Sequence, residues 1–164
     1  MSIYRHALPQ LAGAPFLTDG GLETTLVFHE RVELPHFAAY PLLEHEPGRE
    51  LLRVYYRRYL ALARGHGLGI VLDAPTWRAS ADWGARLGHD PATLERLNRA
   101  AVDLLAELRA EQPAGGPPVV VAGSLGPRGD GYHPEERTSA VEAERYHSAQ
   151  VRAFAASEAD LVSA

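Results

Sequence analysis

Residues 16–24 read Phe-Leu-Thr-Asp-Gly-Gly-Leu-Glu-Thr, a short apolar run that ends in a carboxylate and two adjacent glycines. Glycines let the main chain bend sharply and leave its N–H groups open to a ligand, because no Cβ stands in the way. Asp19, Gly20 and Gly21 therefore indicate a strand end that presents one acceptor and two donors at one point. An ordinary Asp-Gly turn is the alternative interpretation of the same residues.

Four short apolar runs recur along the chain and predict strands. Each is nearly continuous in apolar character, which is typical of strands that are covered on both faces in a parallel sheet. The runs are residues 14–19, 69–74, 118–123 and 160–164.

Amphipathic segments separate these runs and predict helices. In residues 49–66 apolar side chains recur every three or four positions, with arginines between them and Gly65 and Gly67 as a C-terminal signal. Residues 93–111 and 139–157 follow similar patterns. The order β-α-β-α-β-α-β predicts an α/β fold in which right-handed helical crossovers join parallel strands.

Composition limits the classes of function. The 164 residues are enough for one domain, and 16 Lys and Arg against 21 Asp and Glu give a formal charge of −5. Without a dense basic cluster, nucleic acid is not an expected partner. No signal peptide and no membrane-length apolar segment is visible, so we expect a cytoplasmic protein with no membrane contact. The cysteine count of zero excludes disulfides and thiolate metal ligands from this chain.

Residues capable of chemistry gather after three of the predicted strands. Asp19-Gly20-Gly21 follows the first run, residues 73–78 read Asp-Ala-Pro-Thr-Trp-Arg, and residues 123–130 read Gly-Ser-Leu-Gly-Pro-Arg-Gly-Asp. In an eight-stranded barrel the loops after the strands lie on the face where active sites form. We therefore predict that these three loops converge on a shared pocket.

In this order and spacing, the three loops resemble the homocysteine S-methyltransferase family. The resemblance is carried by Leu-Thr-Asp-Gly-Gly-Leu-Glu-Thr at 17–24, Asp-Ala-Pro-Thr-Trp-Arg-Ala at 73–79 and Val-Ala-Gly-Ser-Leu-Gly-Pro at 121–127. Asp-Trp-Gly at 82–84 and Asn-Arg-Ala-Ala-Val at 98–102 add to it. Members are zinc-dependent (β/α)8 barrels that transfer a methyl group from an activated donor to the sulfur of homocysteine.

The resemblance implies roles for five residues. Asp19 would take the ammonium group of the amino acid, and the N–H groups around Gly20 and Gly21 would hold its carboxylate, since charge-assisted hydrogen bonds suit a zwitterion. Thr76 matches a hydroxyl that the family uses on the same carboxylate. Trp77 is expected to form a wall of the pocket, with a place in the core as the alternative.

Two other acids have structural interpretations. We expect Glu23 to be a first-turn acid near a helix N-terminus. Asp73 is interpreted as a strand carboxylate with a structural partner.

The chain departs from the family in its metal ligands. Family members bind zinc through three cysteines on later strands, and the zinc keeps the homocysteine sulfur as a thiolate. This chain has no cysteine, and its eight histidines lack the spacing that places two on one face. We expect zinc in the complete family enzyme and no metal on this chain.

Length accounts for the missing ligands. A (β/α)8 barrel needs about 250 residues, so residues 1–164 are predicted to form the N-terminal half of a homocysteine-binding barrel, truncated at the fourth strand. A half barrel has open sheet edges, which favour self-association of the chain. The alternative is that the chain is a fragment of a longer protein. A non-catalytic module that binds an amino acid or a protein partner is the competing hypothesis. The sequence identifies neither the methyl donor nor the acceptor thiol beyond this resemblance.

Overall fold

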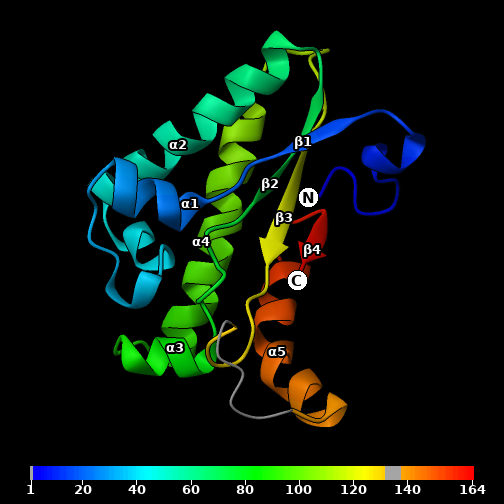
Figure 1. Ribbon diagram of the computed structural model, residues 1–164. Helices are drawn as coiled ribbons and strands as arrows, with labels where there is room; N and C mark the ends of the chain where they lie inside the picture. Colours follow the sequence, from blue (N-terminus) through cyan, green and yellow to red (C-terminus); the bar gives the residue numbers. More distant parts are fainter. Residues whose placement is uncertain (1, 132–137) are drawn as a thin grey trace.

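The computed structural model describes residues 2–131 and 138–164. Four parallel strands form one sheet in the order β1-β2-β3-β4: Phe16–Thr18, Gly69–Asp73, Val119–Ser124 and Leu161–Ser163. Each strand pairs with the next strand along the chain, and helical segments connect them (Figure 1). This confirms the predicted α/β fold, and the sequential strand order is that of a (β/α)8 barrel.

Three long helices correspond to the predicted amphipathic segments. They are α2 (Glu46–Gly65), α4 (Pro91–Ala110) and α5 (Ala140–Ala155). Each starts at a polar cap: a side chain of His45, Asp90 or Ser139 accepts a backbone N–H from the first turn. The left-handed conformation of Gly67, with φ of 65°, follows the end of α2 as predicted.

Several short elements were not predicted. Their residue types match turns as well as helices, so periodicity cannot reveal them. They are the helices α1 (Leu22–Thr24) and α3 (Ala81–Arg86), a π-helical turn at Thr25–His29, and 3-10 turns at Pro9–Ala12, Pro35–Phe37 and Tyr40–Glu44.

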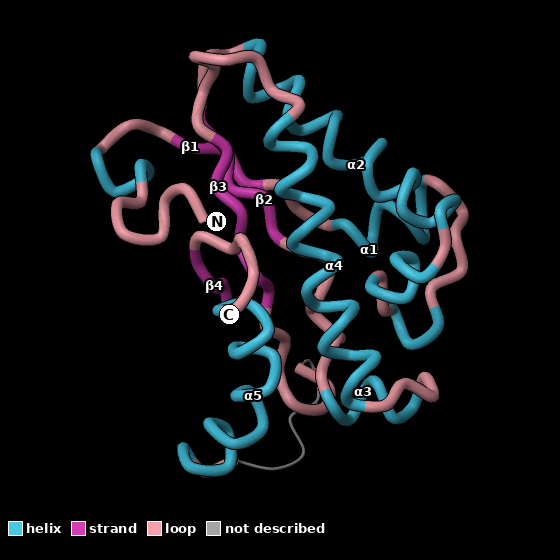
Figure 2. Tube along the Cα trace, turned by 180° about the vertical axis from the view of Figure 1, so that it is seen from behind, coloured by secondary structure: helices cyan, strands magenta, loops and turns pink. Residues whose placement is uncertain are grey.

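The core lies between the sheet and the layer formed by α2 and α4. Ile70 and Leu72 of β2 and Val121 of β3 point into it and are almost completely buried. The N-terminal segment lies on the other side of the sheet (Figures 1 and 2). The helical partners in this core include Leu52, Tyr56, Leu60, Leu97, Ala101, Leu104, Leu105 and Leu108.

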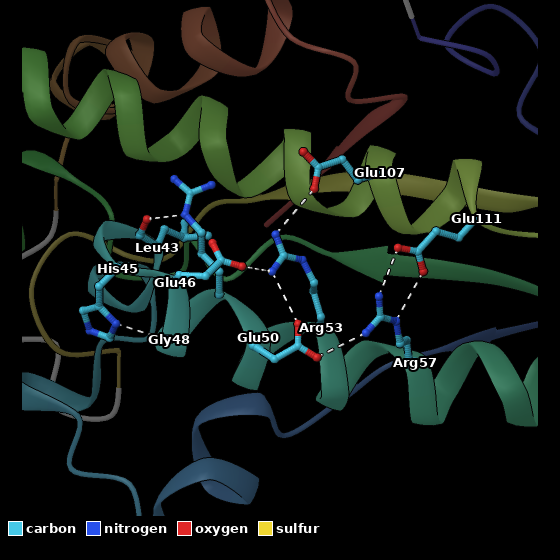
Figure 3. A network of polar contacts seen from close by, with 10 residues as sticks. Leu43, His45, Glu46, Gly48, Glu50, Arg53, Arg57, Glu107 and Glu111 are labelled. Atoms are coloured by element: carbon cyan, nitrogen blue, oxygen red, sulfur yellow. Dashed lines mark hydrogen bonds and ion pairs between the residues drawn. The ribbon is translucent and has the colours of Figure 1, made fainter.

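Ion pairs connect α2 and α4 at their exposed surface. Arg53 pairs with Glu46 and Glu50 of its own helix and with Glu107 of α4, and Arg57 pairs with Glu111 at 3.0 Å (Figure 3). Such exposed pairs contribute at most about 1 kcal/mol each, so hydrophobic burial is the main force that holds the two helices together. None of the helices in the described ranges is long and apolar enough to cross a membrane.

Candidate active site

The site begins where β1 ends, beside the C-terminal end of β2. Asp19 follows β1, and its Oδ1 accepts a hydrogen bond of 2.8 Å from the backbone N–H of Asp73. The hydroxyl of Tyr55 on α2 lies 3.3 Å from Asp19 Oδ2, and its single proton is shared between this oxygen and the Gly20 carbonyl. The carboxylate is therefore fixed by the neighbouring strand and by a helix, while its side chain remains partly exposed.

The two glycines after Asp19 are held by their carbonyl groups. Tyr55 and Tyr59 each donate a hydroxyl hydrogen bond of 2.9 Å to the carbonyl oxygen of Gly20. No heavy atom lies within 4 Å of the place where a Cβ of Gly20 would be. Gly21 has φ of 64°, a left-handed conformation that favours glycine. Among the described residues, the backbone N–H groups of both glycines have no backbone acceptor, so two donors next to the Asp19 carboxylate have capacity for a ligand.

Burial raises the pKa of Asp19 to about 7. The hydrogen bond from the Asp73 N–H opposes this rise, and the negative charge of Asp73 adds to it. Near neutral pH, Asp19 is thus close to its midpoint of ionisation. A cation that binds beside it would favour the carboxylate form.

Thr76 lies after β2, at the same end of the sheet, and is completely buried. Its hydroxyl donates to the carbonyl oxygen of Ser124 at 2.8 Å and accepts the N–H of the same residue at 3.2 Å. The structure does not join this hydroxyl to Asp19 by a contact, since the end of β3 uses its hydrogen-bonding capacity. A carboxylate-binding role for Thr76 stays a prediction.

Trp77 is partly buried at the rim, between the loops that follow β2 and β3. The guanidinium carbon of Arg78 lies 4.8 Å from the centre of the Trp77 ring and 3.9 Å from that of Trp83. A Cβ at Gly126 would overlap the Trp77 carbonyl oxygen, so the loop after β3 packs directly on the loop after β2. These contacts fix Trp77 in place, and its role as a wall of a substrate pocket stays a prediction.

Asp73 has the structural partner that the sequence interpretation expected. The hydroxyl of Ser163 on β4 donates to Asp73 Oδ1 over 2.7 Å. Glu23 lies in the first turn of α1, as expected. Burial raises the pKa of the Glu23 carboxyl, and the charge of Arg78 opposes that rise.

Sequence reasoning missed the tyrosines that support the site. Tyr55 and Tyr59 are four residues apart, which places both on one face of α2. The periodicity of residues 49–66 places both on the apolar face of the helix, although a tyrosine hydroxyl needs a polar partner when it is buried. The need for a polar partner is the sequence signal that the hydroxyls of these tyrosines could reach a strand end.

The residues of this chain do not fit the zinc site that the resemblance implies. There is no cysteine in the sequence, and the described part of the chain has no group of three His, Asp or Glu that could hold a metal ion. The expectation that no metal binds here stays a prediction, and we derive no chemical step through zinc.

The sequence model of the homocysteine S-methyltransferase family matches residues 16–164, which include the strand ends described above. The chain belongs to the homocysteine S-methyltransferase family. A comparison with curated protein sequences gives no significant match.

Two solved structures of a family member have the same fold. Both are of the homocysteine methyltransferase MmuM from Escherichia coli. The metallated form is 26% identical to this chain in sequence, with a TM-score of 0.70. The match covers 96% of this chain and 55% of the MmuM chain. The oxidized form is also 26% identical, with a TM-score of 0.73, and the match covers 98% of this chain and 56% of the MmuM chain. This homocysteine S-methyltransferase family chain therefore spans about half the length of that protein, and its fold is that of a partial (β/α)8 barrel.

Proposed function

We propose that this chain supplies the amino-acid-binding half of a homocysteine S-methyltransferase-like enzyme. The complete enzyme would transfer a methyl group from an activated donor to the thiol of homocysteine, giving methionine. Family membership supports the reaction class. The local arrangement that supports amino-acid binding is the Asp19 carboxylate next to the N–H groups of Gly20 and Gly21, which have no backbone acceptor among the described residues.

The chemistry of a zwitterion matches this arrangement. An α-amino acid carries an ammonium donor and a carboxylate acceptor on one carbon, and it needs an acceptor and donors at the same spacing. Asp19 provides the acceptor, and the N–H groups of Gly20 and Gly21 provide the donors. Because Tyr55 and Tyr59 hold the Gly20 carbonyl, the peptide is oriented before a ligand arrives.

Titration calorimetry with L-homocysteine tests this half of the proposal. We expect saturable binding at one site, weakened by about 1.5–3 kcal/mol in Asp19→Asn, because a charged hydrogen bond is lost. Asp103→Asn, which removes an exposed carboxylate from α4, is the matched control and should bind like the wild type. Equal affinities for wild type and Asp19→Asn would remove Asp19 from the site.

The isolated chain is proposed to be inactive in methyl transfer. A thiol with a pKa near about 8.5 is mostly protonated at neutral pH. The sequence has no cysteine, and residues 2–131 and 138–164 contain no group of His, Asp or Glu that could replace the missing zinc ligands. Purified chain should show no methyl transfer and no stoichiometric zinc by elemental analysis. Either finding, in material free of host enzyme, would contradict this part of the proposal.

A second function is supported by the exposed sheet margins. Both β1 and β4 are edge strands, and Val162 on β4 is 42% exposed. Such edges favour pairing with another chain, which suits a non-catalytic module that binds a partner protein or a second copy. Sedimentation analysis separates the two cases: a monomer across the micromolar range would argue against self-association.

A further inference from the structure

The loop after β2 is held by two buried amide side chains of the helical layer. Gln150 of α5 and Asn98 of α4 are 4% and 1% exposed, and Gln150 Nε2 lies 2.9 Å from Asn98 Oδ1. Gln150 Nε2 also donates to the Thr76 carbonyl oxygen at 2.9 Å, and Asn98 Nδ2 donates to the Ala79 carbonyl oxygen at 2.9 Å. Two helices therefore hold the segment from Thr76 to Ala79, which contains Trp77.

The orientation of both amides is fixed by the acceptors around them. Asn98 Nδ2 faces two carbonyl oxygens, those of Ala79 and, one helical turn earlier, Leu94. A flipped amide would put oxygen against oxygen, so Asn98 Oδ1 faces Gln150 as an acceptor. Gln150 then donates from Nε2, and its two protons match the two acceptors at 2.9 Å, Asn98 Oδ1 and the Thr76 carbonyl. The amide pair thus has a single arrangement.

The same helix face of α5 reaches the end of β3 and a second point of the loop after β2. The carbonyl oxygen of Ser124, the last residue of β3, accepts the Thr76 hydroxyl at 2.8 Å and lies 3.4 Å from Gln150 Nε2. One turn earlier on α5, the Tyr146 hydroxyl donates to the Ser80 hydroxyl at 2.9 Å. Residues four apart share one face of a helix, so this face of α5 connects the two strand ends.

We infer that Gln150 and Asn98 are positioning residues of the candidate site, which hold the loop after β2 against the end of β3. Thr76 and Trp77 of the proposed pocket lie in this loop, so the effect on binding rests on the proposed function. Thr76 and Ala79 are buried, and water does not replace a lost donor there unless the loop moves. Loss of either amide should therefore displace the loop.

NMR spectroscopy of the whole chain tests this displacement. The reporter is the contact between the Trp77 carbonyl and Gly126, to which the two amides donate no hydrogen bond within the described residues. Gln150→Met keeps the length of the side chain and removes its donors. The Trp77 indole and Gly126 backbone N–H signals should both move in this variant. A side chain that contributes only stability would leave the signals of the folded state in place.

Calorimetric titration with L-homocysteine connects the loop to the site. Gln150→Met should weaken binding by about tenfold or more, because Thr76 and Trp77 leave their positions. Gln112→Met is the matched control. The Gln112 amide donates to the Leu108 carbonyl at 2.9 Å, just beyond the C-terminal end of α4, and its loss should change neither the two NMR signals nor the affinity.

Asn98→Ala tests the other amide and covers the case in which the methionine variant does not fold. Alanine favours a helix, so α4 should persist. The substitution removes the donor to the Ala79 carbonyl and the acceptor for Gln150. The signals of Trp77 and Gly126 should move in this variant as well.

The outcomes separate this inference from the proposed function. Unmoved Trp77 and Gly126 signals in folded Gln150→Met would overturn the inference, because the amide would then contribute stability alone. Moved signals with an unchanged affinity for L-homocysteine would overturn the role of the amide pair in the site. If the wild type binds no L-homocysteine, the proposed function fails, while the two NMR signals still decide whether the amides position the loop.

Discussion

The guanidinium of Arg109 and the carboxylate of Asp160 form a buried ion pair of 2.8 Å at the N-terminal end of β4. Asp160 also accepts the N–H groups of Ile3, Tyr4 and Val121, so all its acceptor capacity is used. This end of the sheet lies opposite the strand ends that carry Asp19. In barrels of this type the N-terminal face contributes stability and the C-terminal face contributes chemistry, and the buried pair of Arg109 and Asp160 lies on the stability face.

Asp160→Asn should destabilise the chain strongly. The substitution removes the charge that compensates the buried Arg109, and breaking a buried pair in this way costs about 3–5 kcal/mol. Urea denaturation followed by circular dichroism measures the change. Glu158→Gln is the control, because Glu158 pairs with the same arginine from a side chain that is 44% exposed, and it should cost less than about 1 kcal/mol. Equal losses in the two variants would contradict this account.

Asp19 should make the chain less stable as the pH rises. Its folded pKa of about 7 lies above the ordinary value of 3.8, so the folded state holds the proton more tightly than the unfolded state. The contribution of Asp19 to folding is therefore fully present below pH 3.8 and is lost as the pH rises to about 7. Asp19→Asn removes this loss, so its unfolding midpoint in urea should exceed that of the wild type at pH 8, with a smaller difference at pH 5. A difference in urea midpoint between the two proteins that does not depend on pH would show that folding does not raise the pKa of Asp19.

Thr76→Val should destabilise the junction of β2 and β3. Valine has a similar shape but leaves the partly buried N–H and carbonyl of Ser124 without the Thr76 hydroxyl, at a cost of about 1–3 kcal/mol. Thr76→Ser keeps the hydroxyl and should retain most of the stability. Thermal unfolding of the two variants tests the hydrogen bonds, and a valine variant as stable as the serine variant would show that they contribute nothing.

Gly126→Ala should disturb the contact between the two rim loops. Its Cβ would overlap the carbonyl oxygen of Trp77, so the backbone must move. The expected results are a changed tryptophan fluorescence spectrum and a loss of about 1–3 kcal/mol of stability. Gly65→Ala, where nothing lies within 4 Å of the new methyl group, should leave both unchanged or raise stability slightly.

The fold was predictable because burial and periodicity decide it. The apolar runs at 69–74 and 118–123 correspond to β2 and β3. The side chains on the core face of these strands pack against α2 and α4. The outer strands are shorter than predicted: β1 covers residues 16–18 and β4 residues 161–163. Asp160 was expected to start the fourth strand, but its side chain is committed to Arg109 and to three backbone N–H groups.

The site was predictable only in part. The Asp19-Gly20-Gly21 segment could be singled out because it follows an apolar run, although an Asp-Gly turn explains the same residues. The support from Tyr55 and Ser163 depends on contacts 36 and 90 residues apart in the chain, which no local pattern contains. The burial of the Thr76 hydroxyl against Ser124 is likewise a product of tertiary packing.

The most direct test of amino-acid binding follows the amide signals of Gly20 and Gly21 by NMR while L-homocysteine is added under reducing conditions. The account predicts that both signals shift in a saturable way in the wild type and much less in Asp19→Asn. Saturable shifts confined to other parts of the chain, or none at all, would contradict it.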